Sequence, residues 1–336
     1  MTKLGLTKLF AALVMTFGTM SAGAMTASAQ GAKTLEVIVF PGGFNWTIFV
    51  GQDKGFFEKN GVTVKVTPTP NSQFQLKGLI EGKFDIAMTA MDNVIAYSEG
   101  QGAAKTEVEP DIFAFMGVDA GFLRLVAVPE VKTIADLKGK QVSVDALTTG
   151  YAFVLRKLLE NGGLRHEDIQ FVSAGGGRER FTALLEKKHA ATLLISPFDV
   201  VAEAKGFNRL ANADEALGHY QGVVGAARRS WAKQHEKELV GYITGYLSAL
   251  QWLFDPANKS EAIAILRKHV PDMSEEAATR SYDILVHPTK GFSRDASLDV
   301  KGVQTVLQLR SGYTGKTLTD PSRYYDLGYY NKARKN

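Results

Sequence analysis

Apolar and polar positions follow two patterns along this chain, one typical of helices and one typical of buried strands. The stretch around residue 80 contains both. The apolar side chains of residues 73–80 recur at helical spacing, whereas residues 84–88 are mostly apolar. The polar turn 89–92 then opens a second helical pattern that runs to Tyr97. This succession predicts a helix, a buried strand and a helix, which is half of an α/β layer. Polar residues directly after such a strand lie at the sheet edge where open α/β sheets bind ligands.

The same succession returns later in the chain. Residues 181–185 have a helical apolar pattern, 191–195 form an apolar run, and 196–199 form the turn that opens another helix. The two stretches read LKGLIEGKFDIAMTAMDN and FTALLEKKHAATLLISPFD. Their likeness indicates two similar lobes.

The remaining pattern assigns strands and helices to these lobes. The first lobe is expected to span residues 30–128 and 223–336, and the second lobe residues 129–222. Each lobe is predicted to hold a parallel α/β sheet, because short strands alternate with helices. Pro129 and residues 221–227 mark the expected crossings between lobes, and residues 239–309 are mainly helical. The predicted strands are 35–40, 62–66, 84–88, 112–116, 123–128, 142–144, 169–172 and 191–195.

The first 29 residues differ from the rest. Lys3 and Lys8 precede the largely apolar residues 9–20, and Ala27–Ala29 has the small-x-small pattern of a cleavage site. The apolar run is shorter than the roughly 20 residues of a membrane-spanning helix. We therefore expect a secretory signal that is cleaved near Ala29, with 22–24 as a competing site, and a mature protein in the periplasm.

Composition excludes several classes of function. The net charge is +4, but the basic residues are scattered, which argues against a nucleic-acid partner. The chain has no cysteine, so disulfides, thiolate metal sites, a cysteine nucleophile and a lipidated N-terminal cysteine are all excluded. Its six histidines lack the spacing of metal ligands, and no Gly-x-Ser-x-Gly motif is present. We expect no metal, no cofactor and no enzymatic activity.

Four phrases resemble periplasmic solute-binding proteins of ATP-driven importers. The subgroup is the one for nitrate, sulfonates, taurine and the hydroxymethylpyrimidine precursor of thiamine. The phrases are FVGQDKGFFEKNGVTVKV, LKGLIEGKFDIAMT, TIADLKGKQVSV and LLENGGL, in this order along the chain.

The resemblance implies a bilobal periplasmic-binding-protein fold of type II, with two α/β lobes joined by two crossing segments. It also implies that the closed form docks on an ABC permease of the inner membrane. By this analogy, the pocket residues lie in loops after strands. The expected ligand-binding residues are Gly43, Phe44, Trp46, Thr89, Met91, Asp92, Asp145, Thr148, Thr149, Tyr151, Gly176, Arg178, Ser196, Phe198 and Asp199.

The types of these residues bear on the ligand. Asp92 and Asp199 begin helices, where a carboxylate either caps backbone N–H groups or accepts from a ligand amine. Arg178 is either a surface residue or an anion-binding group. The pocket aromatics Phe44, Trp46, Tyr151 and Phe198 favour a flat aromatic or heteroaromatic, pyrimidine-like ligand.

The sequence therefore predicts a monomeric, exported binding protein that captures a small solute by lobe closure, with Gly222 and Gly225 near the hinge. A sulfonate, nitrate or carboxylate ligand is the alternative within this class. Two other classes stay open: a sensor component that presents its ligand, and an enzyme like the pyrimidine synthase of the thiamine pathway. That enzyme group carries a Cys-rich motif, whereas this chain has no cysteine and has an export signal.

Overall fold

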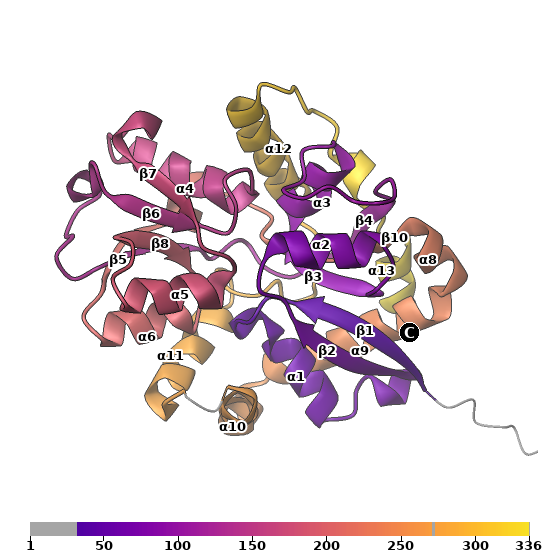
Figure 1. Ribbon diagram of the computed structural model, residues 1–336. Coiled ribbons are helices and arrows are strands. Elements are labelled where there is room, and N and C mark those ends of the chain that lie inside the picture. The colour runs from indigo at the N-terminus through magenta and orange to yellow at the C-terminus, as the bar shows by residue number, and fades with distance from the viewer. Residues whose placement is uncertain (1–31, 271–272, 336) are drawn as a thin grey trace, which may run out of the picture. The chain divides into compact units, whose positions relative to one another are not determined.

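Two sheets form the framework of this protein (Figure 1). The computed structural model describes residues 32–270 and 273–335, so the expected export signal, residues 1–29, lies outside the described residues. Residues from Ala32 onward belong to one compact unit. Each sheet has five strands and carries helices on its faces. We call each sheet with its covering helices a lobe.

The first sheet is mixed. Its strands lie in the order β2 (Val62–Pro68), β1 (Lys33–Val39), β3 (Ile86–Ala90), β10 (Val223–Arg228) and β4 (Ile112–Gly117). β1 pairs in parallel with β2 and β3, whereas β10 runs antiparallel between β3 and β4.

The second sheet repeats this design. β6 pairs in parallel with β7 and β8, and β5 runs antiparallel between β8 and β9. The order is β7 (Gln170–Ser173), β6 (Gln141–Val144), β8 (Ala191–Leu194), β5 (Arg124–Ala127) and β9 (Asn208–Asn212). In both sheets, the strand that arrives from the other lobe, β10 or β5, is inserted at the fourth position.

The predicted internal repeat is confirmed. The unit α2 (Ser72–Ile80), β3, α3 (Met91–Ser98) in the first lobe corresponds to α5 (Gly177–Leu185), β8, α6 (Phe198–Ala204) in the second. Every residue of β3 and β8 is buried. Strands that are covered on both faces have uninterrupted apolar sequences, which is why these two runs were recognisable.

Two expectations about the sheets are corrected. The sheets are mixed and not purely parallel, because β10 and β5 enter in the opposite direction. The strand expected at 123–128 forms, but it pairs with β8 and β9 and belongs to the second sheet. The first crossing is therefore residues 118–123, before Pro129, and the second is residues 218–222, before β10.

Helices complete both lobes. The further helices are α1 (Trp46–Asp53), α4 (Gly150–Asn161), α7 (Ala213–Leu217), α8 (Arg229–Gln234), α9 (Glu236–Leu253), α10 (Lys259–His269), α11 (Glu275–Leu285), α12 (Val300–Thr314) and α13 (Gly328–Ala333). α1, α9 and α13 contact one another or the strands of the first sheet, α10 packs on α1 and α11, and α11 also reaches α6. None of the helices in the described ranges is both long and apolar enough to cross a membrane.

Trp46 is part of the first-lobe core. The sequence assigned it to the ligand, yet its side chain is fully buried. Its indole Nε1 donates to the backbone oxygen of Ala262 at 2.9 Å, and its ring lies edge-on to Tyr282. The indole therefore joins α1 to α10 and α11 and does not face the space between the lobes.

Helix α12 connects the two lobes, since it packs against α3 and α4 (Figure 1). Its Arg310 donates from Nε and Nη2 to the two carboxylate oxygens of Asp92 at 2.7 and 2.6 Å. Nη2 also donates to the backbone oxygen of Thr148 in the second lobe at 2.9 Å. Both side chains of the ion pair are 1% exposed or less. Asp92, another expected ligand residue, is thus engaged by Arg310.

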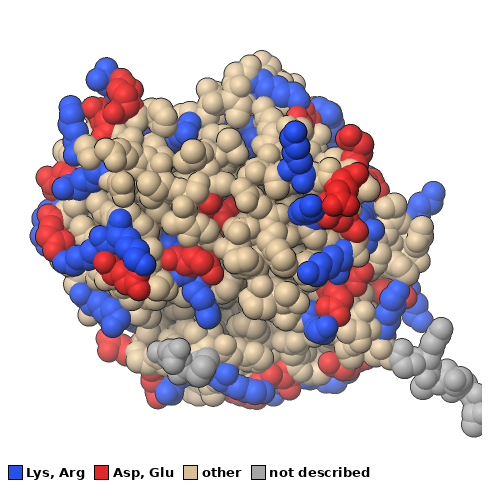
Figure 2. Space-filling view, viewed as in Figure 1, with Lys and Arg blue, Asp and Glu red and all other residues tan. Residues whose placement is uncertain are grey.

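Charged side chains of both signs are interspersed around the margin of the face in Figure 2, and few lie in its middle. No block of a single sign stands out on this face.

Replacing Arg310 with Met should destabilise the protein by about 3–5 kcal/mol, because Asp92 would become an unpaired buried charge. Urea denaturation measures this change. Arg267→Met is the matched control, since Arg267 pairs with Glu275 at the surface and such exposed pairs contribute about 0–1 kcal/mol. If Arg310→Met costs no more than the control, this ion pair is not a structural link.

Replacing Trp46 with Ala should lower the free energy of unfolding by about 3–5 kcal/mol, because a large cavity opens in the core. Trp46→Phe retains most of the packing and loses the bond to Ala262, so we expect a cost nearer about 1 kcal/mol from that bond. Thermal or chemical denaturation of both variants shows whether Trp46→Ala costs more stability than Trp46→Phe. Equal, negligible effects would contradict the core position.

Candidate ligand-binding site

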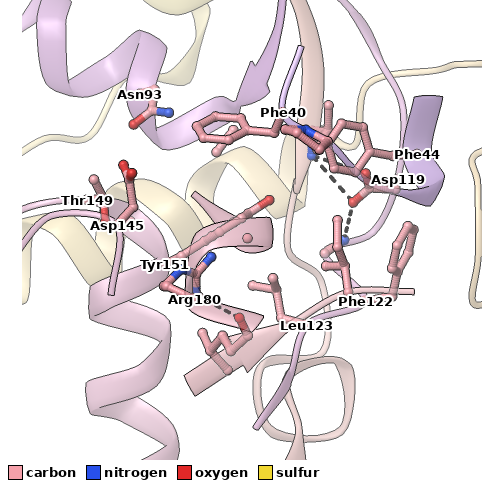
Figure 3. Close-up of a pocket in the computed structure, with 18 residues that line it drawn as sticks. Phe40, Phe44, Asn93, Asp119, Phe122, Leu123, Asp145, Thr149, Tyr151 and Arg180 are labelled. Carbon is pink, nitrogen blue, oxygen red and sulfur yellow. Dashed lines mark hydrogen bonds between the residues drawn. The ribbon is translucent and has the colours of Figure 1, made fainter. Parts of the chain in front are cut away.

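The two lobes meet around a cavity of ≈ 60 Å³. Its walls come from the loops after β1, β6 and β8, from the first turns of α3, α4 and α5, and from the first crossing. Figure 3 shows the side chains that face it, which are mainly apolar. The labelled wall residues are Phe40, Phe44, Asn93, Asp119, Phe122, Leu123, Asp145, Thr149, Tyr151 and Arg180.

Direct contacts between the lobes surround this cavity. The Gly43 N–H donates to the Ser196 oxygen at 2.9 Å, and the Gly176 N–H donates to the Pro70 oxygen at 2.7 Å. The Ser72 N–H, at the start of α2, donates to both oxygens of Asp145 at 3.1 and 3.2 Å. A carboxylate beside the first N–H groups of a helix is favourable, since these groups have no partner inside the helix.

Glycine allows the lobes to approach this closely. A Cβ on Gly150, at the start of α4, would lie 2.3 Å from the Cβ of Asp92 in α3. Real Cβ atoms do not approach that closely, so any larger residue at position 150 would push α4 away from α3.

Aromatic rings form much of the wall. Phe40 follows β1, Phe44 lies in the short helical turn Gly43–Asn45, Phe122 belongs to the first crossing, and Tyr151 begins α4. Phe44 and Phe122 are each 3% exposed, and Phe122 is fixed by an edge-on contact with Phe292. The burial of Tyr151 raises the pKa of its phenol well above the ordinary value. It is therefore a neutral donor at physiological pH.

Arg180 supplies a buried positive charge. Its Nε donates to the Gly175 oxygen at 3.1 Å, and its Nη1 donates to Thr192 Oγ1 at 3.0 Å and to the Leu193 oxygen at 2.6 Å. Among the described residues, no carboxylate lies within 4.0 Å of this guanidinium. Burial lowers the pKa of Arg180, and Asp145 is the acidic group that opposes this change most. The neutral oxygens accept from Nε and Nη1 of the guanidinium. The third nitrogen, Nη2, remains available on the cavity side.

Asp119 supplies a buried acidic group in the first crossing. Its Oδ1 accepts from the Gly121 N–H at 2.7 Å, and both of its oxygens lie 3.4 Å from the Val223 nitrogen. Burial raises the pKa of Asp119 to about 7. The side chain thus joins the first crossing to β10, directly after the second crossing.

The structure brings four of the expected site residues to the cavity wall, namely Phe44, Asp145, Thr149 and Tyr151. Contact of these four with a ligand remains a prediction. Gly43 and Gly176 lie beside the wall and make the backbone contacts between lobes described above. Thr148 is exposed, and its backbone oxygen accepts from Arg310.

Other expected residues lie behind the wall. Thr89 and Met91 are fully buried, and Thr89 Oγ1 accepts from the amide of Asn93, which itself reaches the cavity. Phe198 stacks on Phe181 with ring centroids 5.1 Å apart. These residues shape the wall without lining it.

Asp199 and Ser196 are also placed behind the wall, each 1% exposed or less. Arg124 Nε lies 3.2 Å from Asp199 Oδ2, but the two groups are not aligned for a hydrogen bond. Burial raises the pKa of Asp199, and the charge of Arg124 opposes this. Asp199 therefore belongs to a polar cluster next to β5 and is not a ligand group in this arrangement.

Arg178 is exposed, and Arg180 occupies the position that the sequence assigned to Arg178. Two residues along a helix differ by roughly 200° in direction, so the two arginines face opposite ways. Four further wall residues were not predicted from the sequence: Phe40, Asn93, Asp119 and Phe122. Asp119 and Phe122 lie in a crossing that had been placed elsewhere, whereas Phe40, directly after β1, was counted as part of the strand.

No group of three histidine, aspartate or glutamate side chains in the described ranges is arranged to hold a metal ion. The cavity itself offers two carboxyl groups, Asp119 and Asp145, which approach different partners.

Comparison with known structures identifies the fold. The nitrate-binding protein NrtA of Synechocystis PCC 6803 aligns over 91% of this chain and 89% of its own, with a TM-score of 0.74 and 12% identity. The alkanesulfonate-binding protein SsuA of Xanthomonas axonopodis pv. citri, bound to MOPS, aligns over 87% and 96%, with a TM-score of 0.67 and 17% identity. A Candida albicans protein described as having the generic periplasmic binding protein fold aligns over 90% and 94%, with a TM-score of 0.65 and 14% identity.

These likenesses show the periplasmic-binding-protein fold that the sequence predicted. Comparison with curated proteins gives no match. The family model described as NMT1/THI5 like matches residues 45–259, which include most of both sheets and most of the cavity wall. The chain belongs to the NMT1/THI5-like family.

Proposed function

We propose that this protein is the exported solute-binding component of an ATP-driven importer. The observation that carries the proposal is the cavity itself, whose wall is contributed by both lobes and by the crossing between them. A solute in such a cavity contacts both lobes at once, and these contacts favour the closed arrangement over an open one. Two structural neighbours are a nitrate-binding and an alkanesulfonate-binding protein, which supports a binding function of this kind.

The residues around the cavity favour binding over catalysis. Of the described residues that line it, none is a histidine, serine, lysine or cysteine. The two acidic residues accept from backbone N–H groups, and the arginine is held by neutral oxygens. This is an arrangement for recognising a solute and excluding water.

The wall favours a flat ligand with an aromatic or heteroaromatic ring. Phe40, Phe44, Phe122 and Tyr151 offer ring surfaces, and polar groups are few. Offset or edge-on ring contacts suit such walls. Arg180 Nη2 is the group to which an oxygen of the ligand, such as a carboxylate, a sulfonate or a carbonyl, would bind.

In this proposal the mature protein acts as a monomer in the periplasm and delivers its solute to a membrane permease. The backbone contacts between lobes, Gly43 to Ser196 and Gly176 to Pro70, hold the closed form together. The crossings, where Gly121 and Gly218 have positive φ angles of 68° and 66°, provide the places where the backbone can turn.

Replacing Arg180 with Gln should weaken ligand binding by about 10- to 100-fold, because a charge-assisted hydrogen bond contributes about 1.5–3 kcal/mol. A thermal-shift screen of ring carboxylates, ring sulfonates, pyrimidines and nitrate first selects a ligand, and calorimetry then measures its affinity. Arg178→Gln is the matched control, because Arg178 is on the same helix and exposed.

We expect the control to bind within twofold of the unchanged protein. Circular dichroism shows whether both variants remain folded, since Arg180 also holds Thr192 and Leu193. Equal affinity in the two folded variants would remove Arg180 from the site. A screen in which no compound raises the melting temperature would count against the ligand classes proposed here.

A further inference from the structure

Asp119 does more than join the first crossing to β10. A carboxamide at this position could accept the Gly121 N–H equally well and would carry no charge into the interior. Burying a carboxyl group is unfavourable unless its charge is compensated. Among the described residues, no cation lies within 4.0 Å of Asp119, and its Oδ2 has only the 3.4 Å approach of the Val223 N–H. One oxygen of a cavity-lining carboxyl group therefore lacks a strong partner.

Arg180 does not compensate Asp119. No hydrogen bond or ion pair within 4.0 Å joins the two groups in the described part of the chain, although the charges of both act on the phenol of Tyr151. In the view of Figure 3, Asp145, Thr149, Tyr151 and Arg180 lie on one side of the cavity, and Asp119 lies on the other side with Phe44 and Phe122. The cavity thus holds Arg180 with Asp145 as its nearest acidic influence, and a separate buried carboxyl group, Asp119, that has no cationic partner among the described residues.

Each charge restricts the ligand. An anionic ligand satisfies Arg180 but brings a second negative charge towards Asp119, and a cationic ligand has the converse problem. A molecule with an oxygen anion at one end and a nitrogen donor at the other compensates both groups at once. Charge complementarity of this kind selects against ligands that carry only one of the two groups.

We infer that the solute is bipolar: a ring compound whose anionic oxygen binds Arg180 and whose ammonium, amidine or ring N–H group donates to Asp119. Aromatic amino acids and amino-substituted aromatic acids belong to this class. The inference rests on the proposed function, because it assigns both ends of the same ligand cavity.

Binding of a cationic donor should depend on pH. Asp119 accepts such a group only when ionised, and burial raises the pKa of Asp119 to about 7. Affinity should therefore increase as the pH rises through about 7 and then level off. The charge of Asp119 acts on the phenols of Tyr151, Tyr220 and Tyr246, and burial raises the pKa of each phenol above its ordinary value. These phenols remain neutral over this range.

The test uses three matched probes: 4-(aminomethyl)benzoate, which is bipolar, 4-ethylbenzoate, which lacks the amine, and 4-methylbenzylamine, which lacks the carboxylate. Calorimetry of the mature protein from pH 5.5 to 8.5 should give the bipolar probe at least a tenfold advantage at pH 8. That advantage should shrink at low pH. In Asp119→Asn it should disappear at every pH while binding of 4-ethylbenzoate persists.

Equal affinity for the bipolar probe and 4-ethylbenzoate in the unchanged protein would overturn this inference and leave the proposed function intact. Binding of none of the three probes would instead contradict the ring-binding cavity on which both rest. If Asp119→Asn does not fold, the affinities of the three probes for the unchanged protein, and their dependence on pH, still test the inference.

Discussion

Arg180 is removed from water and surrounded by neutral oxygens, and much of the site follows from that constraint. A guanidinium in the interior is costly unless its donors are satisfied and its charge is balanced. Gly175, Thr192 and Leu193 satisfy the donors on one side and hold the group rigidly against β8. The balancing charge is left to Asp145, which lies beyond ion-pair distance and is itself bound to the first lobe through Ser72. The two charged groups of the second lobe, Arg180 and Asp145, therefore depend on contacts from the first lobe and from the ligand in the cavity.

The architecture brings these groups together because both sheets have the same strand order. In each lobe the unit of helix, buried strand and helix ends at the same sheet edge, and the inserted strand carries the crossing segment past that edge. The loops after β1, β6 and β8 therefore converge with the first crossing on one cavity. Helix α12 adds an attachment outside the cavity, where Arg310 contacts Asp92 of one lobe and the backbone of the other. Its position shows that the C-terminal helices do more than cover the first sheet.

The sequence predicted the parts of this arrangement that depend on local pattern. The repeated unit was visible because buried strands and amphipathic helices leave strong apolar signals, and the loops after strands did reach the cavity in the cases of Phe44, Asp145, Thr149 and Tyr151. Long-range pairing was not visible in this way. Arg310 lies far along the chain from Asp92, so nothing near Asp92 indicated that its carboxylate would be engaged. The pairing of β5 likewise depends on where the chain crosses to the second lobe. The sequence pattern placed this first crossing too late, at Pro129.

Helix phase accounts for the remaining differences. Arg178 and Arg180 begin the same helix, and local sequence does not say which of the two faces the second sheet. Trp46 follows a loop that does reach the cavity, yet as the first residue of α1 it directs its indole into the core against Tyr282. Aromatic residues suit a core as well as a ligand site, so their type alone could not decide between the two.

The central claim is that the solute joins two half-sites on separate lobes, and a distance measured between the lobes tests it most directly. Because the chain has no cysteine, spin labels can be placed only where they are wanted, on cysteines introduced at the exposed Lys65 of β2 and Lys188 after α5. Electron–electron double resonance would then be recorded with and without the compound that gives the largest thermal shift. We expect the ligand to shorten the distances between the two labels and to narrow their distribution. Superimposable distributions at saturating ligand would contradict this expectation.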